Sequence, residues 1–261
     1  MSPTPSVALS ARNVTMQFGD FVAVQSVSLD LIAGERRALI GPNGAGKTTL
    51  FNVISSRLRP SRGEVHYAGR NMASMTADAI CRQGLVRTFQ ITSIFPRLTV
   101  LQNVQAALYS RHGHARWVWQ RSGKVDREEA LDCLATVGID RFADEHGANM
   151  SYGDQKRLEL AIALALKPKV LLLDEPTAGV EAQTRRSLVE LIMRLCAEQK
   201  LTLLFCEHDM DAVFRIADRI TVLHQGQVLA EGTPEDIQSD PRVRSVYLGS
   251  SHPAPIGGGG A

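Results

Sequence analysis

Apolar and polar positions alternate along the first part of the chain, a pattern typical of β-strands. Residues 7–14 are expected to form the opening strand, and residues 22–32 one or two more. Residues 37–40 form a short apolar strand that runs directly into a glycine-rich loop, and a helix is expected from about Lys47 to Ser56. A short antiparallel strand is predicted within residues 61–69. This part of the chain therefore combines antiparallel strands with one strand–loop–helix unit.

Strand signals vanish from about Leu98 to Val137, where the apolar spacing becomes helical. Beyond Ser151 the alternation of helices and strands returns, with apolar strands at residues 169–174 and 201–206 and a hairpin that turns at Gln225–Gly226. We therefore expect an α/β fold in a single domain, residues 1–261, with an antiparallel β subdomain and an inserted α-helical subdomain. The expected divisions are an α/β core at about 7–93 and 165–249, a helical subdomain at about 94–164, and a flexible tail at 250–261.

Composition narrows the function classes only modestly. Hydrophobic residues make up 44% of the chain and charged residues 21%, which is ordinary for a globular protein. The net charge of +2, from 29 basic and 27 acidic residues, gives no reason to expect a nucleic-acid partner. No apolar stretch approaches the roughly 20 residues that span a bilayer, so any role at a membrane is expected from the cytoplasmic side. The four scattered cysteines are interpreted as buried thiols in a reducing compartment.

The glycine-rich loop at residues 41–49 fits the pattern GxxxxGK[ST]. Glycines let backbone N–H groups turn inward around phosphates, and the helix that follows adds its dipole. Lys47 supplies a positive charge for the β- and γ-phosphates of a nucleotide, and the Thr48 hydroxyl can bind Mg²⁺. An ordinary glycine-rich turn is the alternative, which the order strand, loop, helix disfavours. ATP is therefore expected to contact the whole loop: Gly41, Pro42, Asn43, Gly44, Ala45, Gly46, Lys47, Thr48 and Thr49.

Two carboxylates end the apolar strand at residues 169–174. Asp174 at its C-terminal edge can hold Mg²⁺, directly or through water, and Glu175 can act as general base or orient the attacking water. Many buried strands end in an acidic residue, so this motif gains its meaning from the phosphate-binding loop that precedes it.

Together these motifs resemble the ABC ATPase family, and the resemblance covers nearly the whole chain. It implies a RecA-like P-loop NTPase core that binds ATP and Mg²⁺ and hydrolyses ATP. It also assigns three further residues: Phe18 as the aromatic side chain that stacks on adenine, Gln90 of the Q-loop as a sensor of Mg²⁺ and the γ-phosphate, and His208 as the switch histidine. The implied catalytic set is Glu175, His208, Gln90 and Lys47, and the implied metal ligands are Thr48, Gln90 and Asp174. Residues 178–181 match the family's D-loop, although Glu181 replaces the commoner Asp.

The family's signature motif, usually LSGGQ, has a variant form at residues 150–154, which we call the signature segment. Ser151 and Gly153 are retained, and the resemblance implies that they contact the γ-phosphate of ATP held on the opposite subunit. Ser151 is also a suitable N-cap with Asp154 as capping-box partner, so a well-capped helix is the alternative, and the two are compatible. Tyr152 replaces a glycine, so its surroundings must accommodate a ring.

The signature segment, the Gln90 loop and the chain's ending (residues 231–249) resemble those of branched-chain amino acid importer ATPases. This implies two transmembrane permease subunits, a second ATPase subunit, identical or homologous, and indirectly a solute-binding protein. The expected location is the cytoplasmic face of the inner or plasma membrane. ATPases of urea and short-amide importers end similarly and stay open as alternatives. A soluble ABC ATPase is disfavoured because the chain has one cassette and no heptad run, and a small-molecule kinase would need neither signature segment nor switch histidine.

Overall fold

A six-stranded sheet forms the centre of the computed structural model, which describes residues 6–88, 94–112 and 125–248. Its strand order is β10-β9-β3-β8-β7-β6, and all neighbours run parallel except the β9–β10 hairpin. The strands are β3 (Arg36–Ile40), β6 (Leu85–Arg87), β7 (Val170–Asp174), β8 (Thr202–Cys206), β9 (Arg219–His224) and β10 (Gln227–Gly232).

The central strands are buried on both faces, which explains their continuous apolar sequences. In β7, Leu171 and Leu173 pack into a hydrophobic cluster on one face of the sheet, whereas Leu172 packs into a second cluster on the other. Successive side chains of a strand point to opposite faces, so each strand contributes to both clusters. The sheet thereby fixes the carboxyl ends of β7 and β8 side by side.

The second sheet is antiparallel, with the order β2-β1-β4-β5. Its strands are β1 (Val7–Phe18), β2 (Phe21–Ile32), β4 (Arg62–Tyr67) and β5 (Arg70–Asn71). Helix α1 (Lys47–Ile54) lies between the two sheets, and Leu50, Phe51 and Ile54 belong to the same cluster as strand residues of both. The helix is thus held from both sides while its N-terminus stays at the edge of the central sheet.

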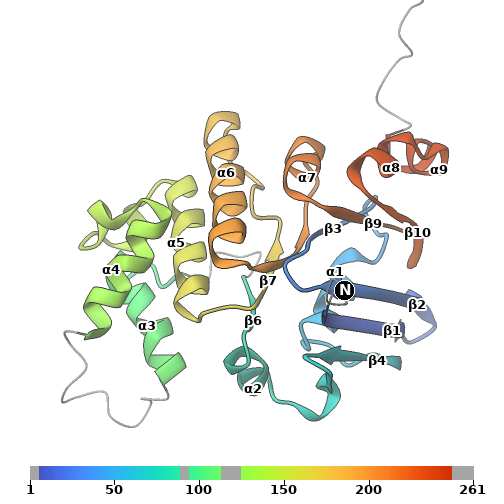
Figure 1. The fold of residues 1–261 in the computed structure, drawn as a ribbon, viewed down its shortest axis with the longest axis horizontal. Helices are drawn as coiled ribbons and strands as arrows, with labels where there is room; N and C mark the ends of the chain where they lie inside the picture. Colours follow the sequence, from blue (N-terminus) through green and yellow to red (C-terminus); the bar gives the residue numbers. More distant parts are fainter. Residues whose placement is uncertain (1–5, 89–93, 113–124, 249–261) are drawn as a thin grey trace, which may run out of the picture.

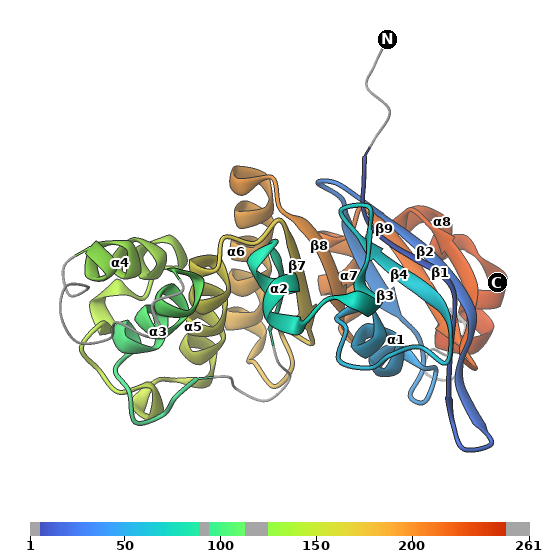
Figure 2. The same ribbon diagram turned by 90° about the horizontal axis from the view of Figure 1, so that it is seen from below.

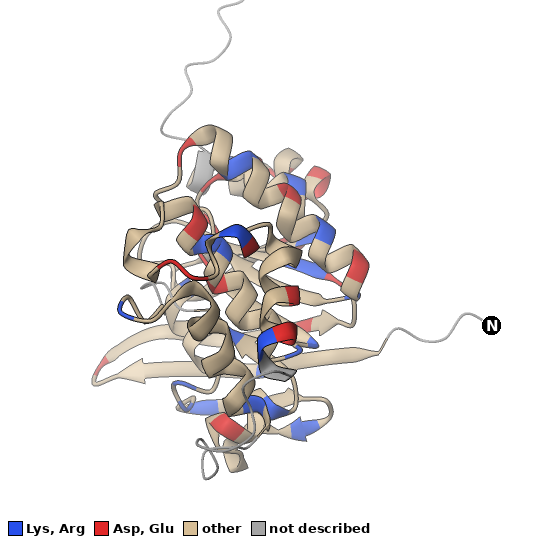
Figure 3. Ribbon diagram, turned by 90° about the vertical axis from the view of Figure 1, so that its left-hand side faces the viewer, with Lys and Arg blue, Asp and Glu red and all other residues tan. Residues whose placement is uncertain are grey.

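Helices cover the other face of the central sheet and form one end of the molecule (Figures 1 and 2). Helices α3 (Val100–His112), α4 (Val125–Val137) and α5 (Tyr152–Ala165) pack against one another, and α6 (Ala182–Gln199) and α7 (Met210–Ile216) follow β7 and β8. The shorter helices are α2 (Ala77–Arg82), α8 (Pro234–Ser239) and α9 (Pro241–Val243), with single turns at Met72–Ser74, Asp140–Phe142, Gly147–Asn149 and Arg244–Leu248. Acidic and basic side chains are interspersed over the α3–α5 end (Figure 3).

The elements expected from periodicity are confirmed, with differences at their ends. The opening strand extends to Phe18 and the helix after the glycine-rich loop stops at Ile54. Several short elements were not expected, among them α2, β6 and α7, because each is too short to show a period. The proposed subdomain limits stay a prediction, and the tail at 250–261 lies outside the described residues. Among the helices of the described ranges, none is long and apolar enough to cross a membrane.

Candidate functional site

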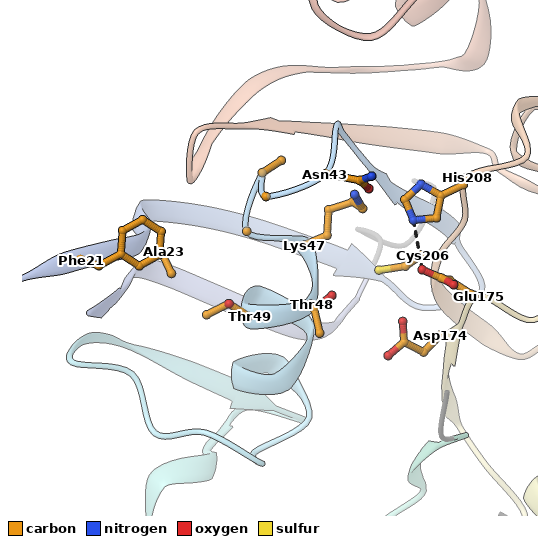
Figure 4. Close-up of a pocket in the computed structure, with 13 residues that line it drawn as sticks. Phe21, Ala23, Asn43, Lys47, Thr48, Thr49, Asp174, Glu175, Cys206 and His208 are labelled. Carbon is orange, nitrogen blue, oxygen red and sulfur yellow. Dashed lines mark hydrogen bonds and ion pairs between the residues drawn. The ribbon is translucent and has the colours of Figure 1, made fainter. Parts of the chain in front are cut away.

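A pocket of about 300 Å³ opens at the N-terminus of α1, beside the carboxyl ends of β7 and β8 (Figure 4). It is lined by most of the glycine-rich loop and by the chemically active residues that follow the two strands. The lining comprises Phe21, Ala23, Asn43, Gly44, Ala45, Gly46, Lys47, Thr48, Thr49, Asp174, Glu175, Cys206 and His208. Segments far apart in the sequence therefore meet around one cavity.

The glycine-rich loop is packed too closely for side chains at two positions. A Cβ on Gly41 would lie 2.2 Å from the carbonyl oxygen of Leu223, and one on Gly46 would lie 2.5 Å from that of Ala23. Both residues also have positive φ, +151° and +97°, which disfavours other residue types. The loop thus rests against β9 and β2, and this contact fixes its shape.

The N-terminus of α1 faces the pocket without a capping side chain. Gly46 is the N-cap, and the first turn of the helix contains no acidic residue. The first backbone N–H groups of a helix lack partners within it and carry the positive end of its dipole. This arrangement favours an anion such as a phosphate at the loop.

Lys47 is buried inside the loop, with 8% of its surface exposed. Its Nζ donates hydrogen bonds to the carbonyl oxygens of Gly41 at 2.6 Å and Pro42 at 3.1 Å. Burial lowers the pKa of the lysine, and nearby Cys206 and Glu175 partly oppose this shift. The ammonium is therefore held by backbone carbonyls, without a carboxylate partner within the described residues.

Asp174 is the last residue of β7 and is 4% exposed. Its Oδ2 accepts a hydrogen bond of 2.8 Å from Nη2 of Arg87 on the neighbouring strand β6. The Thr48 hydroxyl lines the same pocket. Hydroxyl and carboxylate oxygens are the ligands that Mg²⁺ prefers. No cluster of three or more acidic, His or Cys side chains suited to a metal occurs in the described ranges. The Thr48 and Asp174 oxygens could hold a metal whose remaining ligands are phosphate oxygens.

Glu175 has a left-handed backbone, with φ of +50°. For a residue with a side chain this costs roughly 1–2 kcal/mol, and such strain persists only where surrounding contacts hold it. The Glu175 N–H donates to the carbonyl of Cys206 at 3.0 Å, which ties the residue to β8. This turn directs the Glu175 carboxylate toward His208 (Figure 4).

Oε1 of Glu175 lies 3.0 Å from Nε2 of His208, which follows β8. An ionised carboxylate only accepts hydrogen bonds, so Nε2 carries the proton in this pair. The side chain of His208 is 46% exposed and that of Glu175 is 24% exposed, so water reaches both. A base and a proton-bearing partner are thus positioned beside the loop.

The lining of the pocket includes Phe21 and not Phe18, so the expected contact of Phe18 with adenine stays a prediction and Phe21 is a second aromatic side chain near the loop. The two residues pair directly across the turn between β1 and β2. β2 is the edge strand of its sheet. The Gln25 N–H of β2 donates to Gly226 O at 2.8 Å, and the Gly226 N–H donates to Ala45 O of the glycine-rich loop, so the Gly226 turn connects β2 to this loop. Phe18 and Phe21 are both exposed, at 48% and 65%.

The signature segment lies at the start of α5, in the helical end of the molecule and away from α1 (Figure 1). Ser151 is its N-cap: Oγ accepts from the Asp154 N–H at 3.2 Å and donates to Asp154 Oδ2 at 2.7 Å. The expected capping box is therefore incomplete, because Asp154 bonds to the Ser151 hydroxyl rather than to its backbone N–H. Neither Ser151 nor Gly153 lines the pocket of its own chain.

Tyr152 packs on the D-loop of the same chain. A Cβ on Gly179 would meet the Tyr152 ring at 3.2 Å, and a Cβ on Gly153 would lie only 2.5 Å from Cγ2 of Thr184 on α6. The Nζ of Lys156 lies 5.5 Å from the centre of the Tyr152 ring. Tyr152, which stands where the family's motif has a glycine, is thus accommodated because the residue opposite its ring, Gly179, has no side chain.

Gln90 lies outside the described residues, so its expected position stays a prediction. Arg87, Glu207 and Phe21 are site residues that sequence reasoning missed. Arg87 stands within the Arg87–Gln90 match but carried no assigned role, and a buried Glu beside His208 has no distinguishing local pattern.

Comparisons with known proteins agree with this geometry. Residues 24–178 match the family described as "ABC transporter", and residues 227–253 match "Branched-chain amino acid ATP-binding cassette transporter". The chain is 39% identical over 250 residues to the high-affinity branched-chain amino acid transport ATP-binding protein LivG of Salmonella typhimurium, covering 93% of this chain and 98% of that protein. It is 36% identical over 251 residues to BraF of Pseudomonas aeruginosa, with the same coverage of both chains.

Two solved structures are similar in fold. The ATP-binding cassette MJ1267 of an ABC transporter has a TM-score of 0.83 and 29% identity, over 94% of this chain and 100% of that one. The ATP-binding cassette MJ0796, a dimer in a post-hydrolysis state bound to ADP and phosphate, has a TM-score of 0.75 and 29% identity, over 87% of this chain and 98% of that one.

Proposed function

Since the chain belongs to the ABC transporter ATP-binding family, we propose that it hydrolyses ATP to energise an importer of branched-chain or related amino acids. The observation that carries the proposal is the convergence of Lys47, Asp174, Glu175 and His208 on one pocket at the N-terminus of α1. Phosphoryl transfer depends mainly on positioning and on charge stabilisation, and these four side chains supply both.

The glycine-rich loop at residues 41–49, called the phosphate loop from here on, binds the nucleotide. Its backbone N–H groups and the α1 dipole surround the phosphates, while Lys47 exchanges its carbonyl partners for phosphate oxygens. The whole loop, Gly41–Thr49, takes part, and Phe21 offers a ring for the adenine base, with Phe18 paired beside it.

Mg²⁺ bound with ATP would neutralise charge on the β- and γ-phosphates. Thr48 and Asp174 would hold it, and Asp174 is free to use Oδ1 because Oδ2 is occupied by Arg87. Gln90 is the remaining proposed ligand. Each of these groups is a hard oxygen donor, which suits Mg²⁺.

Glu175 orients or deprotonates the attacking water, and His208 contacts the γ-phosphate. Both side chains lie at the mouth of the phosphate loop, and their mutual hydrogen bond shows that they reach the same point in space. When ATP is bound, Glu175 gives up this hydrogen bond to contact the attacking water, and His208 gives it up to contact the γ-phosphate. The proposed base therefore follows β7, and the proposed γ-phosphate contact follows β8.

The complete site requires a second ATPase subunit, identical or homologous. Ser151 and Gly153 lie at the α5 N-terminus, and the side chain of Ser151 is exposed. Because they do not line the pocket of their own chain, we propose that they close over ATP held by the partner subunit. The dimeric state of the similar cassette MJ0796 supports this arrangement.

The proposed membrane partners are two permease subunits, served by a solute-binding protein, with this chain on the cytoplasmic face of the inner or plasma membrane. Support comes from the match of residues 227–253 to the branched-chain amino acid family and from LivG and BraF. At the helical end, Phe95 is 57% exposed and precedes α3, where a permease loop can contact it. The mixed charges of that end do not favour nucleic acid (Figure 3).

The catalytic assignment is tested with Glu175→Gln and Lys47→Ala. Glu175→Gln should keep ATP binding and lower turnover by at least about a hundredfold. Lys47→Ala should weaken ATP binding itself. Glu198→Gln, at an exposed position of α6, is the matched control and should behave as wild type. Wild-type turnover in Glu175→Gln would refute the assignment of the base.

The transport assignment is tested by partner capture. Tagged Glu175→Gln protein held in Mg-ATP should recover polytopic permeases from native membranes, and the ligand of their solute-binding protein then identifies the cargo. A binding protein specific for urea or short amides would replace the amino acid assignment. Recovery of ribosomal or DNA-associated proteins alone would leave the ATPase chemistry standing and remove the importer.

A further inference from the structure

Glu207 is a buried carboxylate beside the catalytic pair, with 2% of its surface exposed. Its Oε1 accepts two hydrogen bonds of 2.7 Å from Thr177, one from the backbone N–H and one from the hydroxyl. Its Oε2 accepts a hydrogen bond of 3.1 Å from the backbone N–H of His208. Burial of a carboxylate is costly unless donors satisfy it, and here each oxygen has at least one. The side chain is therefore held in one orientation.

Through Oε1, Glu207 holds the turn that carries Glu175. The turn is closed by a hydrogen bond of 3.2 Å from Ala178 N–H to Glu175 O, and Thr177 lies within it. The Glu175 N–H is itself bonded to Cys206 O, so the turn is attached both to the last residue of β8 and to Glu207, which follows it. Because Glu175 has a left-handed backbone, these attachments are what keep it in that conformation.

Through Oε2, the same carboxylate holds the backbone of His208. The tips of Glu175 and His208 are 3.0 Å apart, although they belong to different loops. One side chain thus bonds to both loops, and the width of a carboxylate sets the distance between them.

We propose that Glu207 is a positioning residue for ATP hydrolysis, which fixes Glu175 and His208 relative to each other and to the γ-phosphate. This rests on the proposed function, in which Glu175 acts on the attacking water and His208 contacts that phosphate. Glu207 touches neither ATP nor water in this role. It acts on the rate of the chemical step and leaves the phosphate loop, and hence ATP affinity, unaffected.

The substitution Glu207→Gln separates this role from simple packing, because the amide has nearly the same shape but only one acceptor oxygen. If its oxygen stays on Thr177, its NH₂ group faces the His208 N–H, and two donors oppose each other. If the amide turns over, the NH₂ faces Thr177 and its backbone N–H loses its acceptor. Either way one of the two loops is released.

The measurement is steady-state ATPase kinetics with a separate assay of nucleotide binding. Glu207→Gln should lower kcat about tenfold to a hundredfold and leave KM and ATP affinity within about a factor of two, as expected for displaced catalytic groups. In the double variant with Glu175→Gln, turnover should be no lower than in Glu175→Gln alone. Glu207 acts by positioning the catalytic pair, so its loss has no further effect once Glu175 has been replaced. Glu198→Gln serves as the control.

A second pair of variants guards against misfolding. Thr177→Val removes the hydroxyl donor and Thr177→Ser keeps it, so Ser should retain more of kcat than Val. Equal kcat in the two, wild-type kcat in Glu207→Gln, or fully multiplicative losses in the double variant would overturn the role of Glu207. Wild-type turnover in Glu175→Gln would instead overturn the proposed function, so the two failures are distinguishable.

Discussion

Arg87 connects three parts of the nucleotide site, and removing its charge should destabilise the protein strongly. Its Nη2 donates to Asp174 Oδ2 at 2.8 Å, and its Nη1 donates to Asn52 Oδ1 and Ser55 Oγ, both at 2.7 Å. The guanidinium carbon lies 4.7 Å from the centre of the Phe51 ring. Asn52, Ser55 and Phe51 belong to α1 or its end, so Arg87 joins strand β6, the carboxylate of β7 and the phosphate-loop helix.

The expected loss follows from burial. The side chains of Arg87 and Asp174 are 8% and 4% exposed, and breaking a buried ion pair from one side costs about 3–5 kcal/mol. Asn52 and Ser55 are only partly buried, so water can replace the arginine there. Arg87→Met fills similar space and keeps a contact with the Phe51 ring. We therefore expect about 4 kcal/mol, or a melting temperature lower by about 10 °C.

The assay is urea and thermal unfolding of four proteins: wild type, Arg87→Met, Asp174→Asn and the double variant. Asn at 174 removes the unpaired buried charge, so the double variant should be more stable than Arg87→Met alone. Arg82→Met is the matched control, since Arg82 pairs with Asp78 at exposed positions and should lose less than about 1 kcal/mol. A comparably small loss in Arg87→Met, or no recovery in the double variant, would refute the reasoning.

Three further predictions concern separate regions. Phe21→Ala should raise the ATP dissociation constant more than Phe18→Ala, measured by titration with a fluorescent nucleotide, because Phe21 lines the pocket. Gly153→Ala should leave ATP binding unchanged but impair ATP-driven dimerisation in light scattering, because the added methyl would lie 2.5 Å from a side-chain carbon of α6. Hydrogen bonds from Arg111 lower the pKa of Glu129 below 4.5, so its stabilisation is present above that value and is lost as the pH falls through the lowered pKa. The melting-temperature difference between wild type and Glu129→Gln should therefore exist at about pH 7 and vanish once the pH has fallen through the lowered pKa; a difference that persists in acid would contradict this.

The conformation of the glycine-rich loop was predictable because it is local. Gly41, Gly46 and Lys47 act through the backbone conformation and sequence spacing of one strand–loop–helix unit. The Asp174–Glu175 pair was predictable for the same reason, since a buried strand must end where polar residues begin. In both cases the sequence neighbours determine where the residue lies in the fold.

The remaining site residues depend on which elements become neighbours, which local patterns do not encode. Arg87 acquires its role only because β6 pairs with β7, and Glu207 only because the end of β8 lies beside the turn at Thr177. Phe21 lines the pocket because β2 is the edge strand next to the loop, which the local pattern does not encode. A resemblance identified the histidine and the signature segment, but it did not identify these supporting contacts.

The position of β3 in the central sheet determines when the glycine-rich loop can take its folded shape during synthesis. β3 lies between β8 and β9, and the Gly226 N–H donates to Ala45 O at 3.0 Å, so the phosphate loop rests on segments from near the end of the chain. A ribosome releases the N-terminal part first, and the β1–β2 hairpin can pair early because its contacts are local. The strand that carries the loop must wait for both of its neighbours. An unfinished chain therefore contains the Gly41–Thr49 sequence without the strands that pack against it, and the loop can take its folded shape only after the β8 and β9 segments and Gly226 have been synthesised.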